Sequence, residues 1–144
     1  MWVVAEILER KTGMDFREFV RARVLNPLGL SDDFVLGIPE DSVRRVAEVV
    51  HTGTGITREE LQRIGLEEPP ATAITEEAIL SLNDPCVRAV GIPGAGGICT
   101  AAALALFYQA LLHGRSLGRP RVWSDETLSG ARRVRSGEVR DPQF

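Results

Sequence analysis

The chain has 144 residues, of which 44% are hydrophobic and 26% are charged, which suits one domain with its own core and excludes a disordered chain. No apolar run reaches the roughly 20 residues that span a bilayer, and "MWVVAEILER" lacks the basic start of a secretory signal, so we expect neither a membrane span nor a leader. The net charge of −3 gives no general case for nucleic-acid binding.

Cys86 and Cys99 are the only cysteines. Their spacing fits neither a CxxC redox pair nor a zinc knuckle, and only His51 and His113 could assist them. We therefore expect no metal site. Two thiols without a disulfide pattern favour a reducing compartment such as the cytoplasm.

A first helix is predicted over residues 2–11. Val4, Ile7 and Leu8 fall on one stripe of this helix, as in an amphipathic helix that buries one face. Gly13 follows directly and is suited to end the helix, because glycine adopts the left-handed conformation at low cost.

A second helix is predicted to begin after Asp15, whose carboxylate can cap it, with Glu18 completing a box-like pattern. Asn26-Pro27 predicts its end, because the residue before a proline avoids the helical conformation. "PLGLSDDF" then has the composition of a turn. The predicted buried face of the helix consists of Phe16, Phe19, Val20 and Val24.

The middle of the chain is less regular. Residues 42–50 fit either a helix or a strand. Thr57 and Glu60 have the spacing of a capping box, which predicts a short helix that ends near Gly65. Another short helix is predicted from Thr75 through about Leu82.

Residues 84–114 carry the clearest helical signals. Asp84-Pro85 predicts a helix start, with proline at the first helical position. After a glycine-rich loop, Thr100 is a suitable cap for a long helix that ends at Gly114. The predicted apolar face of this helix repeats at helical spacing through Leu104, Phe107, Tyr108, Leu111 and Leu112. 

The C-terminal stretch, residues 115–144, is rich in arginine. It holds seven Arg against four acidic residues, a net charge of +3, which leaves −6 on residues 1–114. A basic stretch can bind anions, but a solvated face is the commoner meaning, and we favour it. Ser124 or Asp125 is expected to cap a last helix through about Arg132. No long alternating strand pattern occurs, so the sequence predicts a mostly α chain.

The glycine-rich loop, Gly94-Ala95-Gly96-Gly97, could cradle a phosphate ahead of a helix. A dinucleotide fingerprint, however, would need glycine where Cys99 stands, and a P-loop would need lysine where Gly97 stands. We favour a loop in which backbone segments approach closely.

Three other side chains have a reactive type. Cys99 lies beside a helix N-terminus, where a thiol can become nucleophilic, but no base is recognisable near it, and a small buried thiol is the favoured interpretation. His113 belongs to the last turn of a helix, where a histidine needs no further role. His51 lies in a polar loop with no recognisable partner.

Lys11-Thr12-Gly13 spells one of the three motifs of serine β-lactamases, and Ser31-Asp32-Asp33 comes close to a second. The catalytic S-x-x-K motif is nevertheless absent, because Lys11 is the only lysine and Leu8 stands three positions before it. We therefore interpret Lys11-Thr12-Gly13 as the end of a helix and "SDD" as part of a turn.

Two other stretches do resemble the serine β-lactamase family, in particular class C-like β-lactamases and penicillin-binding-protein-like esterases. "AEILERKTGMDFREFVRARVLNPLGLSDDF" resembles the family's helix, TG turn, second helix and "PLGM-(S/T)-D-T-F"-like turn. "VGIPGAGGICTAAALALFYQALLHG" resembles its glycine-rich loop and following helix, with Ala103 where the family often has aspartate. "NDPCVRAVGIPGAGG" is similar to an actinobacterial-type esterase branch.

The resemblance implies a partial chain. In this family the S-x-x-K and Tyr-x-Asn motifs lie upstream of the matched region, and the third motif lies downstream on a strand of the main sheet. Residues 1–144 are therefore expected to be a single partial domain. It would be the helical subdomain of the β-lactamase-like α/β fold without its main β-sheet, and residues 115–144 would match less closely.

The resemblance also sets the functional expectations. No residue of this chain is expected to be catalytic, and no cofactor is expected. The wall of the substrate cleft would be lined by Gly96, Gly97, Ile98 and Cys99. A small ester or β-lactam would be the partner of a complete enzyme only, and the chain alone would be inactive. The alternative is a non-catalytic helical interaction module. Exposed apolar helix faces could then mediate self-association, while neither nucleic acid nor membrane is an expected partner.

Overall fold

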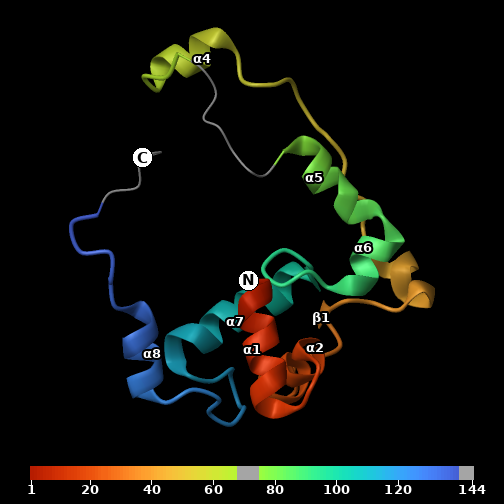
Figure 1. The fold of residues 1–144 in the computed structure, drawn as a ribbon, viewed down its shortest axis with the longest axis vertical. Helices are drawn as coiled ribbons and strands as arrows, with labels where there is room; N and C mark the ends of the chain where they lie inside the picture. The colour runs from red at the N-terminus through yellow and green to blue at the C-terminus, as the bar shows by residue number, and fades with distance from the viewer. Residues whose placement is uncertain (68–74, 140–144) are drawn as a thin grey trace.

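The computed structural model describes residues 1–67 and 75–139 (Figure 1). Within these residues the chain is mostly helical, as predicted, and its β structure is one two-stranded antiparallel sheet. The elements in order are α1 (Trp2–Thr12), α2 (Phe16–Val20), the π-helical turn η1 (Arg21–Leu25), α3 (Asn26–Leu28), β1 (Phe34–Leu36), the 3-10 helix η2 (Glu40–Arg45), α4 (Arg58–Arg63), α5 (Glu76–Leu80), the 3-10 turn η3 (Ser81–Asn83), α6 (Pro85–Val90), β2 (Gly97–Cys99), α7 (Ala101–His113) and α8 (Asp125–Arg132).

The predicted junction between the first two helices is confirmed in its main features. Gly13 ends α1 in the left-handed conformation, with φ of 69°. The Asp15 carboxylate caps α2 by accepting from the Arg17 backbone N–H at 2.8 Å. The backbone N–H of Phe16 donates to Glu9 Oε1 of α1 at 3.0 Å, so a side chain of the preceding helix takes part in the cap.

The predicted end of the second helix at Asn26-Pro27 is wrong. Asn26 keeps helical angles, with φ of −59° and ψ of −50°, and the helical path continues to Leu28. A π-helical turn precedes it at η1, where hydrogen bonds skip one residue further than in an α-helix and so change the local path. The helix then ends at Gly29, where the Leu30 N–H donates to the Leu25 carbonyl at 2.9 Å.

The short sheet joins the two halves of the sequence. Phe34 pairs with Cys99 and Leu36 with Gly97, and the Thr100 N–H donates to the Asp33 carbonyl at 3.0 Å next to the sheet. Part of the predicted glycine loop is therefore a strand. Three residues are too few to show an alternating pattern, and their partner lies some 60 residues away in sequence.

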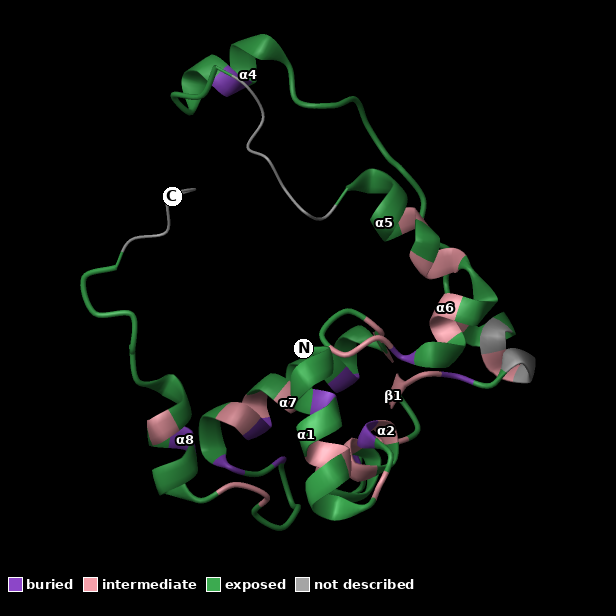
Figure 2. Ribbon diagram, in the orientation of Figure 1, coloured by how far each residue is buried: buried purple, intermediate pink, exposed green. Residues whose placement is uncertain are grey.

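The main core lies between α7 and the segment that runs from η1 to Leu30. Figure 2 shows buried positions gathered in this region. The Phe107 ring is central, with the rings of Phe34 and Trp123 edge-on at 5.5 and 6.2 Å between centroids. The buried cluster consists of Leu25, Leu28, Leu30, Ala103 and Ala110.

The predicted apolar face of α7 is only partly the buried one. Phe107 and Leu111 are half-buried, but Leu104, Tyr108 and Leu112 are exposed. The buried face is set by Ala103 and Ala110, because small side chains let the helix backbone approach its neighbours closely. 

Residues 42–50, for which a helix or a strand was considered, are helical only in their first part. The 3-10 helix η2 ends at Arg45, and residues 46–50 continue without regular structure. Helix α4 follows after Thr57, with the predicted capping box to Glu60 in place, and Figure 1 shows α4 standing apart from the helices around the core. 

His51 does have a partner. Its Nδ1 lies 2.9 Å from Oε1 of Glu76, and its Nε2 lies 2.9 Å from the Gly53 carbonyl oxygen. This pair could not be predicted from local sequence patterns, because Glu76 belongs to the first turn of α5, 25 positions after His51.

The described part of the arginine-rich stretch, residues 115–139, contacts α7. The Arg132 guanidinium donates to the carbonyls of Leu111 and Leu112 at 2.6 and 2.8 Å, at the end of α7. Ser124 caps α8, as predicted. No helix within residues 1–67 and 75–139 is long and apolar enough to cross a membrane.

Candidate functional site

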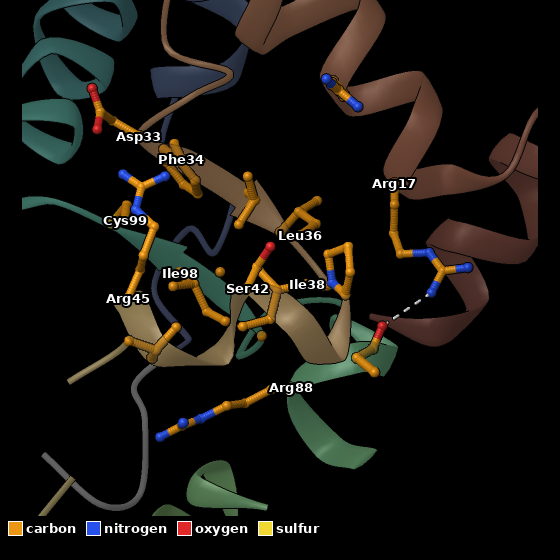
Figure 3. Close-up of a pocket in the computed structure, with 18 of the residues that line it drawn as sticks. Arg17, Asp33, Phe34, Leu36, Ile38, Ser42, Arg45, Arg88, Ile98 and Cys99 are labelled. Carbon is orange, nitrogen blue, oxygen red and sulfur yellow. Dashed lines mark hydrogen bonds between the residues drawn. The ribbon is translucent and has the colours of Figure 1, made fainter. Parts of the chain in front are cut away.

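A cleft of about 960 Å³ opens beside the sheet (Figure 3). Its walls come from four parts of the chain: the α2–η1 helix, strand β1 with the turn before it, the η2 segment, and α6 with the glycine-rich loop. The four residues predicted to line a substrate cleft all belong to this lining: Gly96, Gly97, Ile98 and Cys99. That a substrate binds here stays a prediction.

The glycines of the loop allow backbones to approach closely. A Cβ atom on Gly96 would lie 2.2 Å from the Ile92 nitrogen, and one on Gly97 would lie 3.2 Å from the Phe34 ring. Gly94 has a φ of +94°, which side chains disfavour. The favoured interpretation of the loop, a close approach of backbone segments, is therefore confirmed.

Two further backbone segments approach closely beside the cleft, at Gly37 and Gly91. A Cβ on Gly91 would lie 2.4 Å from the Gly37 nitrogen, and the Ile38 N–H donates to the Arg88 carbonyl at 3.1 Å. Two glycines thus let the segment after β1 pass directly over the end of α6. This contact positions β1 and η2 relative to α6 and so fixes the width of the cleft.

Arg17 fastens α2 to α6 at one edge of the cleft. Its guanidinium donates to both carboxylate oxygens of Asp15, at 2.9 and 2.7 Å, and to the carbonyls of Ala89 and Val90 at 3.3 Å. The side-chain hydrogen bond from Arg17 lowers the pKa of Asp15 to about 2, and the same bond raises the pKa of Arg17. Both groups are therefore charged at neutral pH.

Arg88 and Asn83 fasten the opposite wall. The Asn83 amide donates to the Val49 carbonyl at 2.7 Å and accepts from the Val49 N–H at 2.8 Å. Arg88 donates to the Leu82 carbonyl at 2.8 Å and to Asn83 Oδ1 at 2.9 Å. Asp84 caps α6 through the Cys86 N–H at 2.7 Å. The stretch "NDPCVR" thus connects α6 to the segment after η2.

The remaining candidates do not assemble into a catalytic group. Cys99 lines the cleft and is exposed, contrary to the expected buried thiol, because its position in β2 directs it to the surface. His113 lies in the last turn of α7, as predicted. Lys11 and Thr12 end α1, with the Thr12 hydroxyl donating to the Leu8 carbonyl at 2.8 Å. The described residues hold no cluster of three or more His, Cys, Asp or Glu that could bind a metal ion.

Sequence reasoning did not single out the arginines of the cleft. Arg17, Arg21, Arg45 and Arg88 come from α2, η1, η2 and α6, so their positions in the sequence do not reveal that they line one cleft.

Comparison with known proteins agrees with this geometry. The β-lactamase family model matches residues 1–142. A penicillin-binding protein homolog from Caulobacter crescentus has a similar structure, with a TM-score of 0.61 and 26% sequence identity. The match covers 91% of this chain and 33% of the homolog, so the chain spans about a third of that protein. No curated protein matches the chain. Since the family match extends over nearly all of the sequence, this chain belongs to the β-lactamase family.

Proposed function

We propose that this chain is the helical part of a serine hydrolase of the β-lactamase and esterase type, and that by itself it is inactive. In the complete enzyme a serine would attack the carbonyl of an ester or β-lactam. The ester C–O bond then breaks and the alcohol departs, or the ring C–N bond of the β-lactam breaks and its amine stays tethered, and water afterwards releases the acid from the acyl-serine. The cleft carries this proposal, because it is walled by the glycine-rich loop and by the segment after β1.

The cleft has the character of a ligand site. Its volume of about 960 Å³ is within the usual range for small-molecule sites, and apolar side chains make up much of its wall. The chain lacks the S-x-x-K pair, so the nucleophile and its base would come from outside residues 1–144.

We expect hydrolysis of nitrocefin and of p-nitrophenyl acetate to stay at the buffer rate when the 144-residue chain is added. The reason is that the chain contains no S-x-x-K motif, so it has no serine that a nearby lysine could activate for acylation. The measurement is absorbance against time at several protein concentrations. 

Because exposed thiols react with p-nitrophenyl acetate without turnover, a variant with Cys86→Ala and Cys99→Ala is the control. Multiple turnovers above buffer that disappear on substitution of one residue of this chain would contradict the proposal.

The second candidate is a non-catalytic interaction module, and the surface of α1 favours it. Val4 is 57% exposed and Ile7 is 55% exposed, and Trp2 and Val3 are exposed beside them. Apolar patches of this kind occur where another surface normally packs.

In size-exclusion chromatography, we expect the chain to self-associate through α1 as concentration rises. Ile7→Lys should shift it towards monomer, because a charge on this face must stay hydrated. Val139→Lys is the matched control, since Val139 is 80% exposed and lies outside α1. A wild-type chain that elutes as a monomer at every concentration would contradict self-association through α1.

A further inference from the structure

The arginine side chains that line the cleft differ in whether they form hydrogen bonds and ion pairs within the protein. Among the arginines in its wall, Arg17 holds Asp15 and two carbonyls of α6, and Arg88 holds Asn83 and the Leu82 carbonyl. These two guanidinium groups are engaged in the fold. They stabilise the walls and have few donors left for a ligand.

Arg45 is the last residue of η2. Among the residues that the structure describes, its guanidinium has no hydrogen bond and no ion pair. Figure 3 shows its side chain extending from η2 towards the strand that carries Ile98 and Cys99. A guanidinium stays charged at all ordinary pH values, and its forked donors match the two oxygens of a carboxylate.

Much of the cleft wall is apolar, and Arg45 belongs to this wall as an exposed side chain. The lining brings together side chains from β1, from the segment around η2 and from β2: Phe34, Leu36, Ile38, Val46, Val49 and Ile98. Such a wall can bury the apolar body of a ligand, and an unpaired guanidinium within it supplies one fixed positive charge. The matching ligand is amphipathic, with one anionic end.

The acidic side chains that the structure describes in the cleft wall come from other elements. Glu18 belongs to α2, and Asp32 and Asp33 belong to the turn before β1. In Figure 3 the Arg45 side chain extends towards the end of the cleft where Asp33 lies, but among the described residues no ion pair joins Arg45 to any of these three carboxylates. Arg21 of η1 also lines the cleft without a partner among the described residues, so it is the competing cation.

We propose that this cleft binds small carboxylates with an apolar body, and that Arg45 pairs with the carboxylate. This proposal rests on the proposed function, since it makes the cleft selective for substrates or products that carry a free carboxylate. In that enzyme Arg45 would be a specificity-determining residue rather than a catalytic one.

The test is direct binding to the 144-residue chain, followed by ¹H–¹⁵N correlation spectra. The probes are 4-phenylbutanoate and its neutral amide, which differ in charge but little in shape. We expect the carboxylate to bind at least about tenfold more tightly than the amide, because hydrogen bonds to charged groups are the stronger kind. The shifted signals should include Ile98 and Cys99.

Three variants test which arginine pairs with the carboxylate of the probe. Arg45→Gln should weaken carboxylate binding about tenfold and leave amide binding unchanged. Arg44→Gln is the matched control, because Arg44 is in the same 3-10 helix, is exposed and does not line the cleft. It should bind like the wild type. Arg21→Gln tests the competing cation and should also have little effect.

Equal binding of the two probes, or a larger loss in Arg21→Gln than in Arg45→Gln, would overturn the proposal. Neither result would contradict the proposed function. That proposal is tested by whether the chain alone hydrolyses a substrate, and charge selectivity of the cleft does not enter that test. Conversely, turnover by the chain alone would defeat the proposed function while the binding comparison remained valid.

Discussion

Gly96→Ala is expected to destabilise the chain by about 2–3 kcal/mol, the usual upper range for overpacking. The new Cβ would lie 2.2 Å from the Ile92 nitrogen and 2.6 Å from the Gly91 carbonyl carbon. Both neighbours are backbone atoms in a tight turn, where the Gly96 N–H donates to the Ile92 carbonyl at 2.7 Å. The clash is therefore relieved only by moving the loop that precedes β2.

Urea unfolding followed by circular dichroism measures this effect. Gly130→Ala is the control, because Gly130 is inside α8 and its new Cβ would have no neighbour within 4 Å. That substitution should stabilise the chain by about 0.5–1 kcal/mol, since alanine is the better helix former. Equal unfolding midpoints for Gly96→Ala and the wild type would show that the loop does not need a glycine there.

Asn83→Ala is expected to cost about 3 kcal/mol. It removes both hydrogen bonds to Val49 and the acceptor for Arg88, and each such bond contributes roughly 1 kcal/mol net. The wall formed by residues 46–49 should then separate from α6, and the Val49 amide should exchange its hydrogen faster. Hydrogen exchange together with urea unfolding measures both effects.

Asn83→Asp separates the contribution of the acceptor oxygen, Oδ1, from that of the donor nitrogen, Nδ2. Aspartate keeps an acceptor for the Val49 N–H and for Arg88, and it loses only the donor to the Val49 carbonyl. We therefore expect a smaller loss than with alanine, and a Val49 amide that stays protected. Unchanged Val49 exchange in Asn83→Ala would mean that the wall is held by other contacts.

The helix ends were the best predicted part of the fold, because their signals are local. Gly13 and Gly114 end helices in the left-handed conformation, and Thr57 and Thr100 cap helices through their hydroxyls. In each case the donor and the acceptor lie within four residues of each other, so the sequence alone contains the whole interaction.

The sheet and the cleft were harder to predict because they depend on distant partners. Strands β1 and β2 are three residues long, and the Gly37–Gly91 crossing joins segments more than 50 positions apart. The buried face of α7 was misjudged for a related reason. The helical spacing of large apolar residues pointed to Leu104 and Tyr108, which are exposed, whereas the small Ala103 is buried. 

The Gly37–Gly91 crossing makes residues 38–90 a loop that is closed at its base by backbone contacts. The entropy cost of closing a flexible loop grows only with the logarithm of its length, about 0.6 kcal/mol per doubling. Insertions or deletions within this loop, away from the Asn83 and Arg88 contacts, should therefore leave the sheet and the α7 core intact. Because η2 and Arg45 lie inside the same loop, evolution could alter ligand preference by changing loop length while the scaffold stays the same.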